Sequence, residues 1–323
     1  MQSLRRGRLA VALAAAIVLA LTAATWSQTG TKIRLILPFP PGGPADAMIR
    51  IVAEHIGASG GPAMVVESHP GAGTEIGTEL VSRAAPDGNT LAIISNSFVV
   101  LPHLRKLNYD PLTDFQPVCK LASFPPLIVV ESESPYHTLA ELIDAARAQP
   151  GALTLASIGP ATASQLAFEM LKRDAKADMT FIPFSGYTLA IQALLAKQVT
   201  AALADLSSLQ GQLQTGKLRA LATTARARIA TLPNVPTAIE SGYKSVEAEF
   251  FGAVIAPAKT PKQTIEQLIG WFKTAIAEPE VKERFATLGF FPGGQCGANF
   301  HAVLRKDYDD YGRIIREANI RFE

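Results

Sequence analysis

A strand, a proline- and glycine-rich loop and a helix follow one another between Ile33 and Arg50, and this unit constrains the fold more than any other stretch. Apolar residues run from Ile33 to Leu37, a loop follows from Pro38 to Pro44, and helically spaced apolar residues come next. In such a unit, loop N–H groups and the helix N-terminus face the crevice at the carboxyl end of the strand and favour an anion. The unit predicts a carboxylate or phosphate site, although two glycines can also simply make a tight turn.

The loop is not of a nucleotide-binding type. No Gly-Lys-Ser/Thr follows Gly42 and Gly43, and the spacing of a dinucleotide fingerprint is missing. We expect Asp46 to cap the helix or to orient water in the loop. The residues predicted to contact the ligand here are Pro38, Phe39, Pro40, Gly42 and Gly43.

The first 27 residues have the pattern of an export signal. Arg5, Arg6 and Arg8 precede an apolar run from Leu9 to Leu21, and small residues follow it. The run is shorter than the roughly 20 residues of a spanning helix, so cleavage is expected, with an uncleaved anchor as the alternative. The sequence predicts a periplasmic protein and leaves open whether the general secretory or the twin-arginine route exports it.

Charge and length set further limits. The formal net charge is +2, and removing the three arginines of the signal leaves −1, so the mature chain has no electrostatic footprint for nucleic acid. Roughly 300 mature residues exceed what one core usually supports, which suggests two domains, and we expect a monomer. Cys119 and Cys296 are as compatible with a disulfide as with two free thiols, and no spacing predicts a zinc site. We expect no metal and no cofactor.

Strands and helices alternate along the first domain. Strands at Ala63–Glu67 and Thr90–Ser95 flank a helix from Thr74 to Ala85, which implies a mostly parallel, doubly wound sheet with ligands at the carboxyl ends of its strands. Ser95, Asn96 and Ser97 follow the third strand there, either as ligand contacts or as caps of the next segment.

Two proline-rich or apolar crossings divide the chain. The first lies at Phe124–Pro126 and the second near Val246–Pro257, so we assign residues 28–124 and 250–323 to one domain and 125–249 to the other. Two crossings make a hinge that allows closure around a ligand. The second domain repeats the alternation, with a capping box at Thr138–Glu141 opening its first helix.

A second loop rich in small and hydroxyl residues, from Ser157 to Ser164, is the counterpart of the first. Two helix N-termini would then face a cleft, which suits a ligand with an acidic end and a second acidic or polar end. Each hydroxyl has N-capping as its alternative, and Asp205 at a later strand end has the same alternative. The predicted contacts in this domain are Ser157, Gly159, Thr162, Ser164, Phe184, Ser185, Gly186 and Asp205.

Several motifs together resemble one family, the Bug-type receptors of tripartite tricarboxylate transporters. The first loop belongs to this set, and the other motifs begin at Pro70, Ala85, Tyr109, Gly216, Leu232 and Leu288. The resemblance extends from about Ile33 to the C-terminus. It implies two doubly wound domains joined by a two-crossing hinge, similar to type II periplasmic binding proteins. It also implies a small organic acid as ligand and, as partner, an inner-membrane permease made of a large and a small subunit.

The resemblance assigns the carboxylate to the first loop and the opposite side of the ligand to the Ser157–Ser164 loop. The chain departs from the family pattern at Phe184 and Ser185, where Tyr and Lys are common, and at Thr200, where Asp is common. These changes remove a cation and a phenol from near the cleft, which leaves a monocarboxylate, an aromatic acid or a less charged ligand as alternatives.

An enzyme and a sensor partner are the competing classes of function. The five histidines show no metal-ligand spacing, and no Gly-x-Ser-x-Gly elbow is present, so we expect a binding protein rather than an enzyme. A binding protein that serves a membrane sensor has the same sequence features as one that serves a permease.

Overall fold

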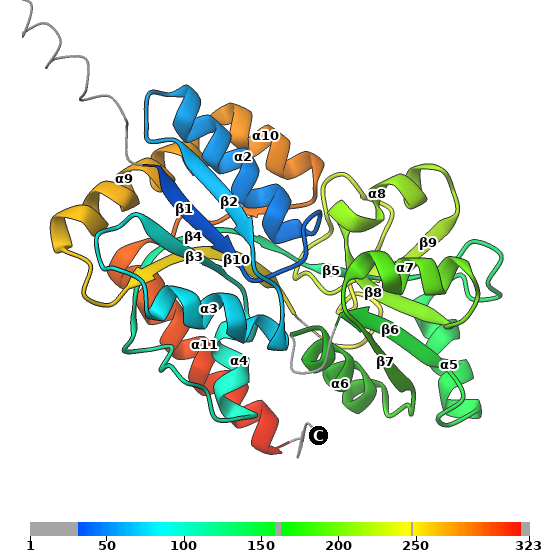
Figure 1. Ribbon diagram of the computed structural model, residues 1–323. Helices are drawn as coiled ribbons and strands as arrows, with labels where there is room; N and C mark the ends of the chain where they lie inside the picture. Colours follow the sequence, from blue (N-terminus) through cyan, green and yellow to red (C-terminus); the bar gives the residue numbers. More distant parts are fainter. Residues whose placement is uncertain (1–31, 159–162, 247, 318–323) are drawn as a thin grey trace, which may run out of the picture. The chain divides into compact units, whose positions relative to one another are not determined.

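The computed structural model describes residues 32–158, 163–246 and 248–317. From Ile33 onward they form a two-domain α/β fold built on two sheets (Figure 1). Within these residues, no helix is both long enough and apolar enough to cross a membrane.

The first sheet has six strands in the order β11-β4-β10-β3-β1-β2. β1 pairs in parallel with β2 and β3, as the alternation predicts, but β10 is antiparallel to β3 and β4, and β11 is antiparallel to β4. β1, β2, β3 and β4 run in one direction, as expected of a mostly parallel sheet, and the sheet is mixed because the returning chain inserts β10 between β3 and β4 in the opposite direction. The bounds are β1 Ile33–Leu37, β2 Met64–Ser68, β3 Thr90–Ile94, β4 Phe115–Phe124, β10 Phe250–Pro257 and β11 Phe291–Pro292.

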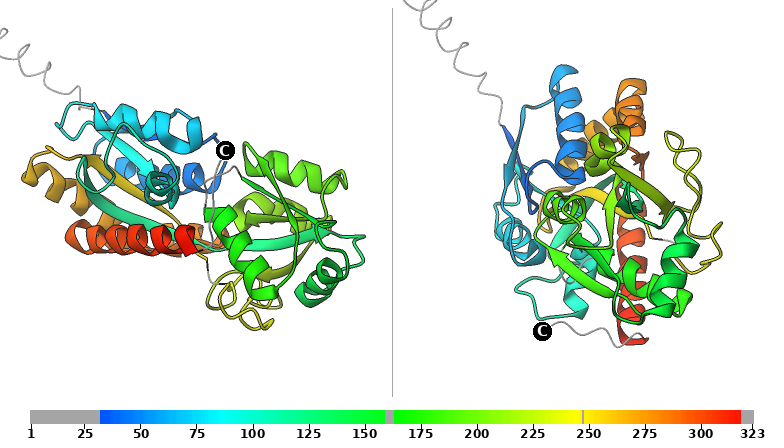
Figure 2. Two further views of the ribbon diagram at one scale, coloured as in Figure 1. Left: turned by 90° about the horizontal axis from the view of Figure 1, so that it is seen from below. Right: turned by 90° about the vertical axis from the view of Figure 1, so that its right-hand side faces the viewer.

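Helices cover both faces of this sheet (Figures 1 and 2). α2 (Pro44–Ala58), α9 (Lys262–Ala277) and α10 (Pro279–Thr287) share one core with Leu35 of β1. Ile36, the next residue along the strand, faces the other core, which contains residues of α3 (Glu75–Ser82), α4 (Ser97–Val100) and α11 (Gly297–Glu317). Successive side chains of a strand point to opposite faces, so the apolar run of β1 fits a strand buried on both sides.

The second sheet has five strands in the order β7-β6-β8-β5-β9. β6 is parallel to β7 and β8, whereas β5 is antiparallel to β8 and β9, so this sheet is also mixed. The strands are β5 Pro126–Glu131, β6 Thr154–Ile158, β7 Thr180–Phe184, β8 Ala201–Asp205 and β9 Leu218–Thr223.

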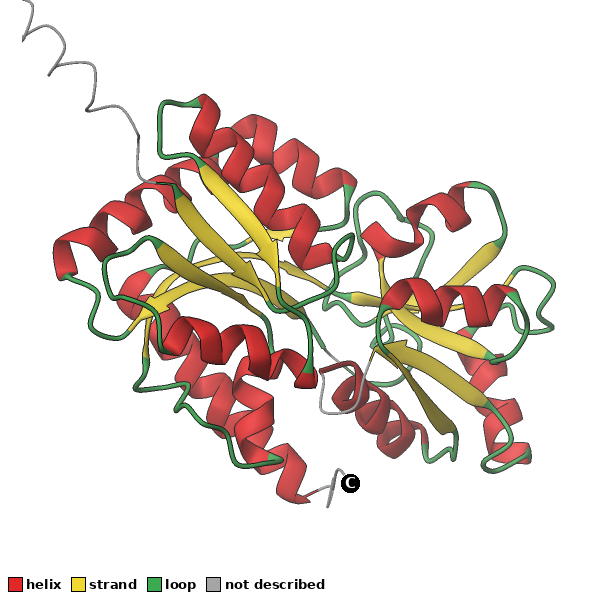
Figure 3. Cartoon of the chain, viewed as in Figure 1, coloured by secondary structure: helices red, strands yellow, loops and turns green. Residues whose placement is uncertain are grey.

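The helices of the second sheet also lie on its two faces, as Figure 3 shows in red against the yellow strands. α5 (Leu139–Ala148) and α6 (Ala163–Ala175) pack on one face, and α7 (Tyr187–Leu195) and α8 (Leu206–Gln214) on the other. The capping box at the start of α5 is confirmed, since Thr138 Oγ1 accepts from the Glu141 amide at 3.2 Å and the Glu141 carboxylate accepts from the Thr138 amide.

Hydrogen bonds join the two passages of the chain between the sheets. β4 ends at Phe124 beside Phe250 of β10, and β5 begins two residues later. Thr224 is buried here, and its hydroxyl donates to the carbonyl of Ala248 at 2.6 Å while its amide donates to the carbonyl of Pro126 at 3.0 Å. Thr224 thus ties the outgoing strand to the returning segment.

A disulfide joins Cys119 to Cys296 across 177 residues of sequence. Cys119 is a buried residue of β4, and Cys296 directly precedes α11. The bond fastens the C-terminal part of the chain to β4, next to the edge strand β11 of the first sheet, and such bonds persist in oxidising compartments. The choice that the sequence leaves open, disulfide or free thiols, is resolved as the disulfide.

Candidate ligand-binding site

The predicted site residues lie at corresponding places in the two sheets. β1 and β3 are parallel neighbours in the first sheet, and β6 and β8 are parallel neighbours in the second. In each pair, the helices that follow the two strands pack on opposite faces of the sheet. Such a point, where the connections diverge, is the usual ligand position of an open α/β sheet.

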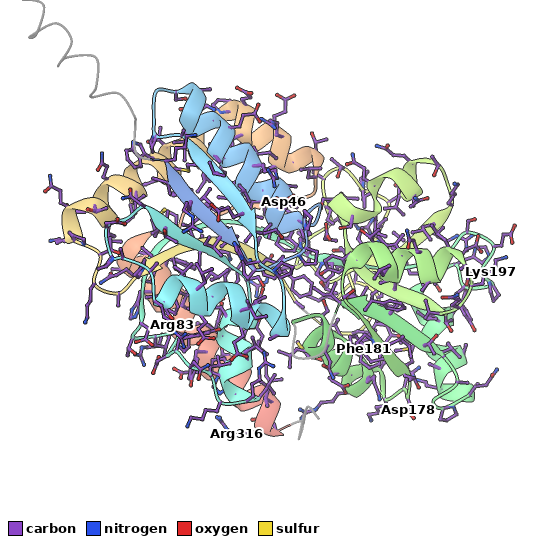
Figure 4. All side chains as sticks on the ribbon, in the orientation of Figure 1. Asp46, Arg83, Asp178, Phe181, Lys197 and Arg316 are labelled. Atoms are coloured by element: carbon purple, nitrogen blue, oxygen red, sulfur yellow. A yellow bond between two sulfur atoms is a disulfide. The ribbon has the colours of Figure 1, made fainter. Side chains whose placement is uncertain are left out.

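The first loop is held from within by Asp46. This carboxylate is buried at the start of α2 (Figure 4), where it accepts from the amide of Gly42 at 2.9 Å and from Arg50 Nε at 2.7 Å. Gly42 has a φ of +83°, which a glycine adopts without the steric cost of a side chain. α2 has no side-chain hydrogen bond at its N-cap, Gly43, so the expected cap is not seen; Asp46 instead holds the loop through the Gly42 amide, which is therefore engaged.

Three amides beside Gly42 remain available. The N–H groups of Gly43, Ala45 and Asp46 have no hydrogen-bond partner among the described residues, and Pro44 between them has no N–H. They form the N-terminus of a 15-residue helix, where partial positive charge favours an anion. Pro40 and Gly42 are exposed, and Gly43 is half-buried.

Neighbouring elements hold this loop in place. Ser68 Oγ at the end of β2 donates to the carbonyl of Phe39 at 2.6 Å. α3 approaches Pro38 so closely that a Cβ at Gly77 would lie 2.8 Å from the Pro38 Cβ, which explains glycine there. Pro38 itself is buried. The loop is thus fixed before a ligand arrives, which lowers the entropic cost of binding.

A second loop of the first domain has an unusual backbone. Gly71, Ala72, Gly73 and Thr74 have φ values of +137°, +47°, +61° and +91° in succession. A β-branched residue such as Thr74 adopts this region only when its surroundings impose it, at a cost of about 1–3 kcal/mol. The conformation brings Thr74 Oγ1 to 3.1 Å from Ser97 Oγ.

Thr74 is a candidate residue that the sequence interpretation missed. Ser97 Oγ also lies 3.3 Å from Ser95 Oγ, so a chain of three hydroxyls runs from buried Thr74 to half-buried Ser95. One feature of the sequence indicates the unusual backbone, since closely spaced glycines such as Gly71 and Gly73 are typical of positive φ values. The sequence does not show, however, that Ser97 lies next to Thr74.

Asn96 makes contacts far away in the sequence. Its Nδ2 donates to Tyr311 Oη at 2.7 Å and to the carbonyl of Glu249 at 3.2 Å, and its Oδ1 accepts from the amide of Phe251 at 3.1 Å. Its side chain does not cap α4. Asn96 therefore ties the end of β3 to the returning strand and to the last helix. Its contact with a ligand stays a prediction.

Two predicted residues of the second domain are engaged in the fold. Ser157 Oγ donates to the carbonyl of Leu203 in β8 at 2.6 Å. Asp205 is fully buried and caps α8, accepting from the Ser208 amide at 3.1 Å, from Ser208 Oγ at 2.8 Å and from Ser207 Oγ. The capping alternative for Asp205 is thus the role seen. Burial raises the pKa of Asp205, and hydrogen bonds from both serines partly offset the rise.

Two further hydroxyls at this end of the sheet have no partner. Ser164 Oγ in the first turn of α6 and Tyr187 Oη at the start of α7 are buried without a hydrogen bond to any described residue. Burial raises the pKa of Tyr187, and the nearby Asp205 carboxylate raises it further. Gly159 and Thr162 lie outside the described residues.

Phe184, Ser185 and Gly186 lie at the end of the edge strand β7. Phe184 is half-buried and lines a shallow pocket of about 330 Å³ together with Leu189, Gln192 and Gln198, while Ser185 is exposed. The pocket follows α7 and the turn after it, and Ser164, Tyr187 and Asp205 are not among its lining residues. The structure therefore brings Phe184 together with α7 rather than with the polar cluster.

The donors that gather at these strand ends are neutral. Free amides and hydroxyls supply neutral hydrogen-bond donors, and within the described residues no group of three or more His, Cys, Asp or Glu is placed to hold a metal ion. Such an arrangement binds an anion without a nucleophile and base in hydrogen-bond contact.

Comparison with known proteins gives one consistent result. The family model described as tripartite tricarboxylate transporter family receptor, TctC, matches residues 48–320. A protein of Cupriavidus necator, described as a UPF0065 protein in the gbd 5' region, is 34% identical over 260 residues, covering 80% of this chain and 79% of that protein.

Solved structures agree in fold. The R. palustris protein Rpa4515 with adipate is 25% identical, with a TM-score of 0.86 over 91% of this chain and 99% of that chain. MatC of Rhodopseudomonas palustris with bound malate is 27% identical, with a TM-score of 0.78 over 88% of this chain and 98% of that chain. The ligands of both neighbours are carboxylates.

Proposed function

Because this chain belongs to the receptor family of tripartite tricarboxylate transporters, we propose that it is a periplasmic solute-binding protein that delivers a small carboxylate to an inner-membrane permease of a large and a small subunit. The ligand binds in a cleft between domains that divide at residues 124/125 and 249/250. The two segments that cross between the domains, which Thr224 joins through hydrogen bonds to Pro126 and Ala248, serve as the hinge.

One observation carries the proposal. The amides of Gly43, Ala45 and Asp46 are unpaired at the start of α2, in a loop fixed by Asp46, Ser68 and the close approach of α3. This is a preorganised donor set without a basic side chain, and it suits one carboxylate. The adipate and malate of the solved neighbours support the same class of ligand.

Binding without chemistry is the second part of the proposal. Ser157 donates to a strand carbonyl and Asp205 caps a helix, so neither is arranged as nucleophile or base. The disulfide supports residence in an oxidising compartment, the periplasm.

The proposal is tested by replacing Gly43 with proline. Gly43 has a φ of −84°, near the value that a proline ring imposes, and the substitution removes its N–H while keeping the carbonyl that accepts from Ala47. Loss of a hydrogen bond to a charged group costs about 1.5–3 kcal/mol, so we expect roughly 10- to 100-fold weaker binding of the acid.

The matched control is Gly43→Ala, which keeps the N–H; an added Cβ would have Pro40 O at 3.9 Å as its nearest neighbour. Thermal shifts are recorded for both variants and wild type with adipate, malate, an aromatic acid and a neutral amide. Wild-type stabilisation follows RT ln(1 + [L]/Kd), about 2.7 kcal/mol at a hundredfold excess over Kd. Equal affinity in Gly43→Pro and Gly43→Ala would exclude this loop as the carboxylate site.

A further inference from the structure

Four polar side chains are buried at the carboxyl ends of the parallel strands β6, β7 and β8: Ser157, Ser164, Tyr187 and Asp205. Ser157 and Asp205 form hydrogen bonds within the domain: Ser157 donates to the carbonyl of Leu203, and Asp205 accepts from Ser208 as the cap of α8. Ser164 and Tyr187 do not. They are 1% and 7% exposed, and their hydroxyls have no partner among the described residues.

An unpartnered buried hydroxyl needs an explanation. Leaving such a group unsatisfied is unfavourable, and native proteins rarely do so without a functional reason. Here the two hydroxyls are neighbours: Ser164 is close enough to Tyr187 to lower its pKa, although the pair does not meet the distance and angle limits of a hydrogen bond, and Asp205 raises the pKa of the same tyrosine. They come from helices on opposite faces of the sheet, at the point where a doubly wound sheet binds its ligand.

The charge beside these hydroxyls decides what they can bind. Among the described residues, the charged side chain that acts on Tyr187 is Asp205, which raises its pKa. Asp205 accepts three hydrogen bonds, which keep its carboxylate in place. A second carboxylate brought to the Tyr187 hydroxyl would meet this negative charge in a buried setting, where repulsion is poorly screened.

We propose that Tyr187 and Ser164 form the second-domain part of the ligand site and that they select a solute with one carboxylate and a neutral polar end, such as an amide, hydroxyl or carbonyl. This inference rests on the proposed function, because the carboxylate end is assigned to the amides at the start of α2. Tyr187 and Ser164 donate to an oxygen of the neutral end, and Asp205 disfavours a second acid.

The test uses C4 to C7 α,ω-diacids, their monoamides and the matching monoacids without a polar end, all against the purified full-length protein. We expect wild type to bind a monoamide more tightly than the diacid or the monoacid of the same length. Tyr187→Phe removes only the hydroxyl, so its affinity for the monoamide falls by about 2- to 10-fold while the monoacid is unaffected. Ser164→Ala gives a loss of the same kind.

Asp205→Asn tests the exclusion of a second acid. Asparagine also caps helices well, so the cap is kept while the charge is removed. We expect the affinity for diacids to rise relative to monoamides. A wild-type preference for diacids, or a monoamide affinity that Tyr187→Phe leaves unchanged, would overturn the inference.

A second measurement needs no ligand. Because the Tyr187 hydroxyl is unpaired, Tyr187→Phe should leave the Tm of the free protein unchanged or raise it. Tyr311→Phe is the matched control, because the Tyr311 hydroxyl accepts from Asn96 at 2.7 Å and its loss should lower the Tm. A lowered Tm in Tyr187→Phe would show that the fold itself uses this hydroxyl and would overturn the inference.

The two proposals fail in different ways. If acids bind wild type and Gly43→Pro weakens them all, but Tyr187→Phe changes none, the α2 site stands and the role of Tyr187 is refuted. If no acid of any class binds, both proposals are refuted.

Discussion

The two sheets have the same strand order around their sites but fix their polar residues differently. β2-β1-β3-β10-β4 in the first sheet corresponds to β7-β6-β8-β5-β9 in the second. After β3, Asn96 reaches Tyr311, which is 215 residues away, and Phe251, which is 155 residues away. At the end of β8, Asp205 is bonded to Ser207 and Ser208, its near neighbours in sequence.

This difference has a physical reason. The first sheet is completed by a segment that returns from the second, so β10 and α11 need contacts that hold distant parts of the chain together. All strands of the second sheet lie between Pro126 and Thr223, and its polar contacts at the strand ends can be local. The comparison contrasts one residue after β3, Asn96, which ties distant parts of the chain, with one at the end of β8, Asp205, which caps the helix that follows it.

The largest expected effect is the loss of the disulfide in the first domain. Cys119→Ala with Cys296→Ala should lower the free energy of unfolding by about 2–5 kcal/mol, because the bond restricts a long loop of the unfolded chain. Urea denaturation of wild type with and without dithiothreitol, and of the double variant, measures the loss. The double variant serves as the control, since reductant should not affect it. If reductant leaves the wild-type midpoint unchanged, the disulfide does not stabilise the fold.

A smaller loss is expected from Asn96→Ala. The substitution breaks three hydrogen bonds and leaves the amide of Phe251 and the carbonyl of Glu249 without their partner at a buried site, which costs about 2–3 kcal/mol. Chemical denaturation gives the change, with Ser95→Ala as a control because the Ser95 hydroxyl has only the 3.3 Å contact with Ser97. Similar losses for both variants would contradict the role of Asn96 as a long-range tie.

The sequence predicts the local features of this molecule. The strand from Ile33 to Leu37, the loop after it and the capping box at Thr138 are each determined by residues a few positions apart, and the structure has all three. Asp46, which was expected to cap its helix, instead accepts from the amide of Gly42 in the loop, and α2 has no side-chain hydrogen bond at its N-cap.

Features that depend on tertiary contacts were not predictable. The pairing of Cys119 with Cys296 and the contact of Asn96 with Tyr311 require the path of the chain between them. The antiparallel insertion of β10 is of the same kind, because one strand sequence fits either direction. Only its burial without a hydrogen-bond partner among the described residues makes the Tyr187 hydroxyl a candidate donor, and burial of this kind depends on tertiary contacts.

The smallest expected effect is a pH-dependent change in stability at Asp205. This residue is the charged strand end of the second domain, whereas the corresponding residue of the first domain, Asn96, is neutral. Burial raises the pKa of Asp205 above its ordinary value of 3.8. Because the pKa of Asp205 is higher in the folded state than in the unfolded state, protonation of this group stabilises the folded protein. This stabilisation is fully present below the unfolded pKa and is lost as the pH rises through the folded pKa. Asp205→Asn resembles the protonated form, so it should be more stable than wild type at neutral pH, and the difference should shrink as the pH falls toward 3.8.

Asp310→Asn provides a control of opposite sign. Hydrogen bonds from Lys306 and Arg313 lower the pKa of Asp310, so this carboxylate contributes stability above its unfolded pKa that is lost as the pH falls. Asp310→Asn should therefore be slightly less stable than wild type at neutral pH and equal to it in acid. Thermal unfolding of both variants and wild type from pH 7 to about pH 2 makes the measurement, because the contribution of Asp310 is lost only below its unfolded pKa of 3.8. If the stability difference between Asp205→Asn and wild type is the same at every pH, burial does not raise the pKa of Asp205. The charged strand end of the second domain and the neutral one of the first, at Asn96, would then not differ in how stability depends on pH.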